Sequence, residues 1–405
     1  MKKLIKKITV VIITAAMLIS ALSLSAFAAD KNYLVLGDSI SAGYVPGGTY
    51  LTDQAFCNII GAQRGYTVDN QAVTGSRTGD VLTKLSSGTL DEQIKNADLI
   101  TLTIGGNDMM DVVYKATAAL YNTHNPTSPI TADMVTAILS DSSDSRYLST
   151  LLALLASLKD IPSSQDFADE KALFANNLSN IVTYIRARNT KAAFIIETQY
   201  DPYKRAFGNA LPEQIAAVTQ GINELNAIIT DPANGAGTKY AVAQTYTAFE
   251  NSTDNLCNAS LSPISVDFHP NIAGHAVIAQ TMMDALDTYI YFDYMMPDGT
   301  AQRVAAVKNS NVTLSCPQAF SREGYTQTGW TDVQGGEKKY DIGQTMVAGA
   351  SMTLYPVWSK NAEPEKKASI ADTNDSSMPF AFAGITGVAA LSSFGIFRRR
   401  KRSGI

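Results

Sequence analysis

Two polar segments far apart in the chain contain a hydroxyl nucleophile and an imidazole base. Ser39 lies in a Gly-Asp-Ser-Ile turn directly after the apolar run 33–36, and His269 lies in Asp-Phe-His-Pro, much later in the 405-residue chain. A serine hydroxyl is a weak nucleophile unless a base lies within hydrogen-bond reach and a third group orients that base. Asp267 offers such a group. These residue types predict nucleophilic attack by serine, although Gly-Asp-Ser alone is equally typical of an ordinary turn.

Two further polar turns lie between these segments. One contains Gly75 in Ala-Val-Thr-Gly after a short strand-like run, and the other contains Asn107 in Gly-Gly-Asn-Asp directly after the apolar run 98–104. In an open α/β sheet, the functional residues gather in the crevice outside the carboxyl ends of the strands. The turns that follow these runs are therefore expected to lie at one crevice.

In this order, the four blocks resemble those of the SGNH hydrolases, the family of GDSL-type esterases and lipases. The matching residues are Ser39, Gly75, Asn107 and His269, and the resemblance covers residues 31–290. It implies an α/β fold of the SGNH/flavodoxin-like kind, with a mostly parallel sheet and helices on both faces. It also implies that carboxylic esters are hydrolysed through an acyl-enzyme without a cofactor.

The resemblance gives each matched residue an expected role. Ser39 is the expected nucleophile, and His269 is the base that takes its proton. The backbone N–H groups of Ser39 and Gly75 and the side-chain amide of Asn107 are expected to form the oxyanion hole. One such donor typically contributes about 2.7–4 kcal/mol to stabilising the transition state.

Asp267 is the expected orienting acid, at a spacing that differs from much of the family. Many members place the acid three residues before the histidine, whereas the gap to His269 is two here. In an extended segment, residues two apart point to the same side, so the carboxylate is still expected to reach the imidazole. A backbone carbonyl is the alternative orienting group.

The remaining histidines are expected to serve the structure rather than the chemistry. His275 lies on the helix predicted after His269 and is interpreted as a packing or surface residue, while His124 lies in a predicted loop. Neither has cysteine or carboxylate neighbours at metal-ligand spacing, so no catalytic metal is predicted. Asp38 and Asp108 are interpreted as turn or helix-capping residues.

Strand-like and helical patterns alternate through the predicted catalytic domain, residues 30–290. The predicted strands are 32–36, 66–71, 99–104, 192–197 and 240–244, and the clearest predicted helices are 170–188, 212–229 and 271–289. This alternation favours a mostly parallel sheet covered on both faces. Residues 200–203 follow a strand and are expected either to line the pocket or to pack.

Residues 110–175 match nothing in the family and are interpreted as a helical insertion. Its part 110–165 is expected to contain a pair of helices, including 146–158. Because it follows the Asn107 turn directly, the insertion is expected to overhang the site as a lid or specificity wall. The alternative is a scaffold without substrate contact.

After residue 290 the pattern changes to short strands and glycine-rich turns. Segments around Val312, Trp330 and Trp358 resemble one copy of the Listeria–Bacteroides repeat, a small β-rich surface module, which is assigned to 291–360. A binding role and a spacer role both remain open for it. Residues 361–378, poor in apolar side chains, are predicted to form a disordered stalk.

Both ends of the chain predict export. Residues 1–29 combine four lysines, the apolar run 8–22 and an Ala-Phe-Ala site, as in a secretory signal peptide. Residues 379–397 form an uncharged run long enough to span a bilayer, and five basic residues follow in the tail 398–405. The expected location is the outer face of the cell membrane or the cell wall of a Gram-positive-type bacterium. Because no Leu-Pro-x-Thr-Gly motif precedes the run, wall sorting and membrane retention both remain open.

The net charge of the chain disfavours nucleic acid as a partner. Without the nine basic residues of the two ends, 23 basic residues face 37 acidic ones, a net charge of about −14.

The three cysteines leave disulfide bonding open. Export permits one disulfide, for which Cys57 and Cys257 are the candidates, while three free thiols are the alternative.

The sequence thus predicts an exported, membrane-tethered serine esterase followed by a small β-rich domain. A carbohydrate O-deacetylase and a lipase or lysophospholipase fit the motifs equally, and the oligomeric state stays open. The competing class is a non-enzymatic surface adhesin in which the esterase scaffold displays the β-rich module.

Overall fold

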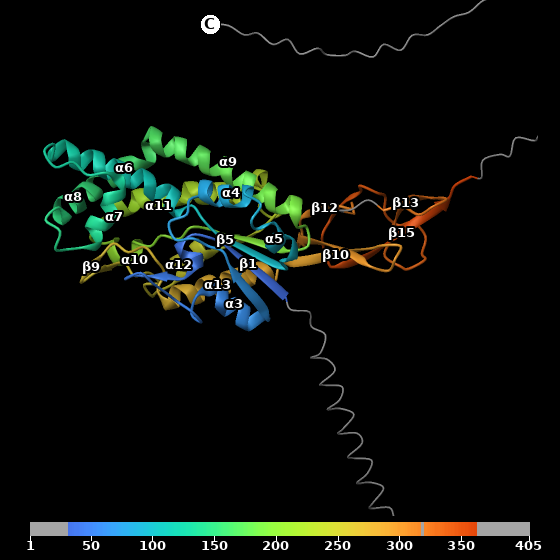
Figure 1. Ribbon diagram of the computed structural model, residues 1–405. Helices are drawn as coiled ribbons and strands as arrows, with labels where there is room; N and C mark the ends of the chain where they lie inside the picture. The colour runs from blue at the N-terminus through green and yellow to red at the C-terminus, as the bar shows by residue number, and fades with distance from the viewer. Residues whose placement is uncertain (1–30, 317–319, 363–405) are drawn as a thin grey trace, which may run out of the picture. The chain divides into compact units, whose positions relative to one another are not determined.

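The computed structural model describes residues 31–316 and 320–362 (Figure 1). The predicted signal peptide, transmembrane run and basic tail, and all but two residues of the predicted stalk, lie outside these residues. Within the described part of the chain, no helix is both long and apolar enough to cross a membrane.

A five-stranded parallel sheet forms the centre of the larger domain. Its strand order is β4-β1-β5-β6-β7, and every neighbouring pair runs parallel. The strands are β1 (Lys31–Gly37), β4 (Tyr66–Asn70), β5 (Leu99–Thr103), β6 (Ala193–Glu197) and β7 (Ala241–Ala243). All five predicted strands are present. The short apolar run of β5 is buried at every position, as is typical of a strand covered on both faces.

Helices cover both faces of this sheet. In β1, Tyr33 and Val35 pack into the core on one face, and Leu34 and Leu36 pack into the core on the other, as the alternation of a strand requires. The first core is completed by α3 (Phe56–Arg64), α12 (Thr245–Asn251) and α13 (Ile272–Leu286), and the second by α4 (Thr78–Ser86), α5 (Asp91–Asn96), α9 (Gln165–Arg188) and α11 (Pro212–Thr230). The predicted fold class is confirmed.

The insertion contains three helices rather than the predicted pair. They are α6 (Gly106–His124), α7 (Ala132–Ser140) and α8 (Tyr147–Ser157), followed by the 3₁₀ helix η1 (Leu158–Ser163) (Figure 1). They pack around small apolar clusters of their own. Because α6 begins at Gly106, the Asn107 turn is the first turn of the helix that leads into the insertion.

Several short elements complete the domain, most of them at the carboxyl end of the sheet. They are α2 (Ser39–Ala42), β2 (Tyr44–Val45), β3 (Thr49–Tyr50), α10 (Lys204–Phe207), η2 (Pro232–Asn234), β8 (Ser260–Leu261) and β9 (Ile264–Ser265).

The second domain is rich in strands, as predicted. One sheet has the order β11-β10-β15-β13, and a separate pair joins β12 to β14. Its core contains Phe292, Tyr294, Trp330 and Leu354. The strands are β10 (Tyr289–Met295), β11 (Ala301–Val307), β12 (Asn311–Thr313), β13 (Tyr325–Thr331), β14 (Thr345–Val347) and β15 (Met352–Lys360).

Tyr289, the first residue of β10, is bonded into the parallel sheet. Its hydroxyl donates to the Phe194 carbonyl (2.5 Å) and accepts from the backbone N–H groups of Phe194 and Ala241 (3.1 Å each). These two residues lie at the amino ends of β6 and β7, so the chain enters the second domain from that end of the sheet.

The candidate disulfide is absent. Cys57 and Cys257 are both buried free thiols, so the predicted bridge is wrong and the alternative of free thiols holds for this pair. Burial raises the pKa of the Cys57 thiol to about 11 and raises the pKa of the Cys257 thiol as well. Thiols in such surroundings are un-ionised and unreactive at neutral pH.

Candidate functional site

The structure brings Ser39, His269 and Asp267 together in one hydrogen-bonded chain. His269 Nε2 lies 2.9 Å from Ser39 Oγ, and His269 Nδ1 lies 2.6 Å from Asp267 Oδ1. The serine and the histidine are buried, with exposed fractions of 2% and 9%. In the tautomer that carries its proton on Nδ1, the imidazole donates to the carboxylate and accepts the serine hydroxyl proton, which is the geometry of a nucleophile, a base and an orienting acid.

A sharp turn at the end of β1 places Ser39. Gly37 has a φ of +131°, and an added Cβ there would lie 2.2 Å from the Thr103 carbonyl oxygen, so only glycine fits. Asp38 then caps the short helix α2 by accepting from the Ile40 N–H (3.0 Å). Its predicted capping role is confirmed.

The Asp38 carboxyl is held away from solvent directly beside the serine. Thr103 Oγ1 donates to it (2.8 Å), and burial raises its pKa to about 6. Its Oδ1 contacts are to Thr103 and Ile40, whereas the imidazole of His269 is bonded to Asp267. Asp38 therefore supports the serine turn rather than the base.

Asp267 reaches His269 through a tight local turn rather than an extended strand. Its Oδ1 accepts from the backbone N–H of His269 (2.8 Å) as well as from the ring, which is the pattern of an Asx turn. The two-residue gap is short enough for this double contact. The carboxylate, not a backbone carbonyl, therefore faces the imidazole.

Two tyrosines after β6 hold the segment that carries the acid and the base. Tyr200 Oη donates to the Phe268 carbonyl (3.1 Å), and Tyr203 Oη donates to the Val266 carbonyl (2.9 Å). Of the two roles expected for these tyrosines, these bonds are those of packing residues with a polar tip. The sequence offered their position after a strand, but not their partners some sixty residues away.

Aromatic rings also enclose the imidazole. The ring of Tyr44, on β2, lies 4.7 Å from the His269 ring, and the Phe268 ring stacks on it at 4.5 Å. Tyr44 was not singled out from the sequence, because only its contact across the fold identifies it. The two rings restrict the imidazole to the orientation that meets Ser39.

Gly75 and Asn107 lie on either side of the serine strand. β1 pairs with β4 on one side and with β5 on the other, so the turns that follow β4 and β5 flank the Ser39 turn. Gly75 has a φ of +83°, which favours glycine, and an added Cβ would meet no atom within 4 Å. Asn107 Nδ2 donates to the Ser76 carbonyl (3.0 Å), and an amide nitrogen has a second N–H for another acceptor.

The other two histidines lie elsewhere. His275 is fully buried on α13 and stacks on Phe56, so its interpretation as a packing residue is confirmed. His124 is the last residue of α6 rather than part of a loop, and its Nδ1 donates to the Leu120 carbonyl (3.0 Å). Among residues 31–316 and 320–362, no three His, Cys, Asp or Glu side chains gather as a metal site would need.

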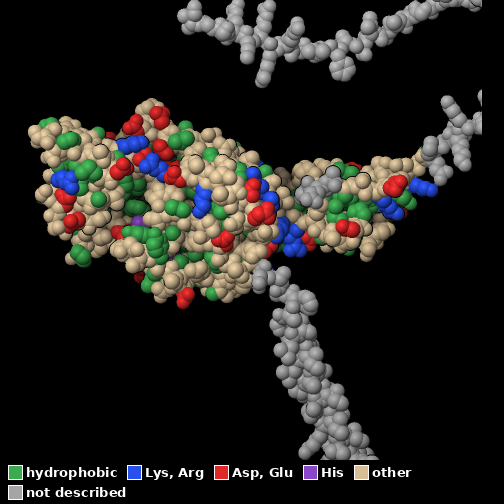
Figure 2. All heavy atoms as spheres, in the orientation of Figure 1, with side chains coloured by type: hydrophobic (Ala, Val, Ile, Leu, Met, Phe, Trp, Pro, Cys, Tyr) green, Lys and Arg blue, Asp and Glu red, His purple; other side chains and the backbone are tan. Residues whose placement is uncertain are grey.

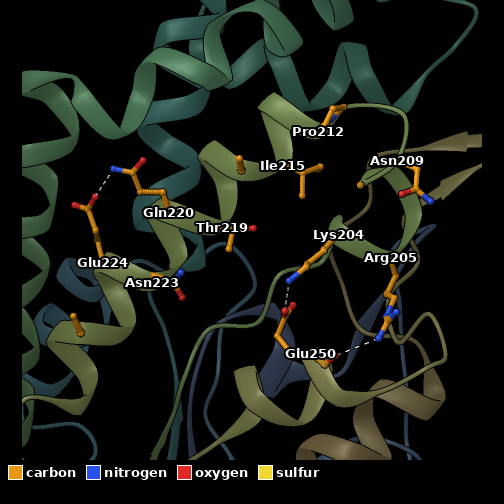
Figure 3. A pocket seen from close by; sticks show the side chains of 13 residues that line it. Lys204, Arg205, Asn209, Pro212, Ile215, Thr219, Gln220, Asn223, Glu224 and Glu250 are labelled. Atoms are coloured by element: carbon orange, nitrogen blue, oxygen red, sulfur yellow. Dashed lines mark hydrogen bonds and ion pairs between the residues drawn. The ribbon is translucent and has the colours of Figure 1, made fainter.

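A cavity of about 1010 Å³ lies apart from these residues, between α10, α11 and α12 (Figure 3). Figure 3 shows the Lys204 and Glu250 side chains facing each other as an ion pair, and Gln220 bonded to Glu224. Lys204 and Glu250 are thus already paired at its wall, whereas the Arg205 guanidinium donates to the backbone carbonyls of Glu250 and Ser252. None of the residues assigned a catalytic role from the sequence lines it.

Two family models match the chain. Residues 35–277 match the GDSL-like lipase/acylhydrolase family, and residues 290–357 match the Listeria–Bacteroides repeat domain.

Relatives and solved structures cover the same part of the chain. An uncharacterized protein from Bacillus subtilis (strain 168), YpmR, is 23% identical over 265 residues, which are 63% of this chain and 82% of that protein. A phospholipase A1 from Streptomyces albidoflavus NA297 is 22% identical, covering 64% of this chain and all of its own, with a TM-score of 0.43. An extracellular lipase from Streptomyces rimosus is 21% identical, covering 63% and 99%, with a TM-score of 0.42.

Proposed function

The chain belongs to the GDSL-like lipase/acylhydrolase family, and on that premise we propose that it hydrolyses carboxylic esters through an acyl-enzyme formed on Ser39. The observation that carries this proposal is the hydrogen-bonded chain from Ser39 through His269 to Asp267, at 2.9 and 2.6 Å. A buried structural serine has no need of an imidazole that is itself oriented by a carboxylate.

In the first half of the reaction, Ser39 Oγ attacks the ester carbonyl carbon while His269 Nε2 takes the hydroxyl proton. Asp267 stabilises the imidazolium that results and keeps the ring in the productive tautomer. The imidazolium then gives its proton to the leaving alcohol. In the second half, His269 removes a proton from water, which attacks the acyl carbon. The bond from that carbon to Ser39 Oγ then breaks, the imidazolium returns its proton to Oγ, and the carboxylic acid leaves.

The negative charge that develops on the carbonyl oxygen needs donors fixed in advance. We assign this role to the backbone N–H groups of Ser39 and Gly75 and to the second N–H of the Asn107 amide. Their support is the sheet order, which puts both flanking turns beside the serine turn. Removing one donor of this kind lowers kcat by about 10²–10³-fold.

Half-exposed apolar side chains near the site support an ester with an apolar acyl group over an acetylated sugar. Tyr50 and Val73 are 54% and 51% exposed, and the Tyr50 hydroxyl bonds to Thr74, the neighbour of Gly75. Hydrophobic side chains also gather in a hollow beside the insertion helices on the face drawn in Figure 2. Exposed apolar surface of this kind is typical of sites for apolar ligands.

The experiment is turnover of p-nitrophenyl esters of increasing acyl length by the purified protein. Ser39→Ala and His269→Asn should abolish turnover, and His124→Asn is the matched histidine control that should leave it intact. Rates that rise from acetate to longer acyl chains support a lipase, whereas a steep loss beyond butyrate supports a carbohydrate O-deacetylase. Absence of turnover in the wild type, or equal turnover in Ser39→Ala, would favour the adhesin alternative.

We also propose that the enzyme acts outside the cell, tethered to the membrane. The support is the sequence of residues 1–29 and 379–397. N-terminal sequencing of the mature protein and protease treatment of intact cells test this. A retained leader, or an enzyme protected from external protease, contradicts it.

A further inference from the structure

Asp108, next to the proposed oxyanion donor Asn107, makes its hydrogen bonds to a different segment of the chain. Its carboxylate is 1% exposed. It accepts from the backbone N–H of Thr78 with both oxygens (3.1 Å each) and from Thr78 Oγ1 with Oδ1 (2.5 Å). Thr78 is the first residue of α4, so Asp108 caps α4 from α6 instead of capping its own helix.

A neighbouring bond joins the same two segments. Asn107 Nδ2 donates to the Ser76 carbonyl (3.0 Å), while Asn177 Nδ2, from α9, donates to Thr78 Oγ1 (3.2 Å). Consecutive residues of α6 thus hold the ends of a three-residue stretch that begins directly after Gly75. Burial raises the pKa of the Asp108 carboxyl, and the bonds from Thr78 oppose that rise.

Local backbone bonds shape the turn that carries Gly75: the Ser76 N–H donates to the Val73 carbonyl (3.1 Å), and the Val73 N–H donates to the Gly37 carbonyl (3.0 Å). Gly75 is exposed, and a Cβ built on it would touch nothing within 4 Å. Arg77 reaches α6 as well, through an ion pair with Asp111 (2.7 Å), but its side chain is 43% exposed. Screening and side-chain entropy make such half-exposed pairs weak. The buried bonds between Thr78 and Asp108 are therefore a stronger link from the segment after Gly75 to α6 than this ion pair is.

We propose that Asp108 is a positioning residue that fixes the backbone N–H of Gly75 relative to the side-chain amide of Asn107. The two donors come from turns after different strands, β4 and β5, and a tetrahedral oxyanion needs both at once. Asp108 joins these turns without touching the substrate. The inference rests on the proposed esterase function, because it assigns a task within the same site.

The first test is a pair of substitutions that keep the size of the side chain. Asp108→Asn replaces an acceptor by an N–H₂ group that faces the Thr78 N–H, and we expect kcat to fall by about 10²-fold at nearly constant KM, since a misplacement of about 1 Å costs that much. Asp111→Asn, one turn along α6, is the matched control and should change kcat by less than about threefold. Equal effects of the two variants would overturn the proposal.

A second pair keeps the test decisive if Asp108→Asn does not fold. Thr78→Val is isosteric but removes the hydroxyl donor, whereas Thr78→Ser retains it. We expect kcat to fall about tenfold in Thr78→Val and to recover in Thr78→Ser, because a hydrogen bond to a charged group is the stronger kind. Equal kcat values for these two variants contradict the proposal.

A third measurement separates positioning from mere stability. A boronic acid that forms a tetrahedral adduct with Ser39 should lose affinity in Asp108→Asn by the same factor as kcat/KM. In a cycle with Asn107→Ala, the two losses should be far from additive, because both act on one oxyanion hole. Additive losses, or unchanged boronate affinity, reject the positioning role. If the wild type itself has no esterase activity, the proposed function fails rather than this inference.

Discussion

The buried imidazole of His275 should make the protein sensitive to acid. Its Nδ1 accepts from the Phe56 N–H at 3.4 Å, and no described residue bonds to Nε2. Burial lowers the pKa of His275 from an ordinary value near 6.5 to about 4, with a further contribution from His269. Between these two pH values the unfolded chain binds a proton that the folded chain does not, so stability falls as the pH falls.

The size of the effect follows from that difference in pKa. This drop in pKa corresponds to about 3 kcal/mol of unfolding free energy, most of which is already lost at pH 4.5 relative to pH 8. Asp38, whose pKa is raised to about 6, works in the opposite direction, because its folded form keeps a proton that the unfolded form releases above pH 3.8. The contribution of His275 must therefore be measured as a difference between two proteins.

The informative comparison is between the wild type and His275→Asn. The Asn carbonyl oxygen is as many bonds from Cβ as Nδ1 is, so it can accept from the Phe56 N–H without binding a proton at acidic pH. Urea unfolding at pH 4.5 and pH 8 should show that the unfolding free energy falls by about 2–3 kcal/mol less in the variant than in the wild type. His124→Asn, an exposed change of the same type, is the control. A variant with the same pH dependence as the wild type would refute the assignment of this acid sensitivity to His275.

Three further predictions concern the site and its support. Asp267→Asn should lower kcat by about 10⁴-fold with little change in fold, because an amide favours the wrong tautomer of the base; steady-state kinetics and circular dichroism test this. Gly37→Ala should lower the unfolding free energy by about 3 kcal/mol or more, because its Cβ would lie 2.2 Å from the Thr103 oxygen at a φ of +131°; an unchanged urea midpoint speaks against that clash. Reductant should leave the thermal midpoint unchanged, since Cys57 and Cys257 are free thiols; a marked drop would point to a bridge.

Much of the central sheet could be predicted because its signals are local. The strand 99–103, for example, is an unbroken run of Leu, Ile and Thr. The two glycines at 105 and 106 indicate the turn that follows it. The order of the four motif blocks then predicted that Ser39 and His269 would share a crevice, and the structure places Nε2 and Oγ 2.9 Å apart.

What the sequence did not reveal depends on contacts between distant segments. Asp108 is interpreted from the sequence as a turn or helix-capping residue, but only the structure shows that it caps the helix that begins at Thr78, thirty residues earlier. A bridge between Cys57 and Cys257 was expected because the sequence predicts export, but spacing along a chain does not fix the distance between two sulfur atoms. The count of helices in the insertion was missed because Ala- and Leu-rich stretches give weak boundaries.

The bonds of the Tyr289 hydroxyl to Phe194 and Ala241 join the start of the second domain to the parallel sheet. They fasten the exit of the chain to the amino ends of β6 and β7, while Ser39 opens the helix after the carboxyl end of β1. Ser39 and the connection to the second domain thus lie at opposite ends of the parallel sheet. The second domain is therefore joined to the sheet by residues other than those of the turn that carries Ser39.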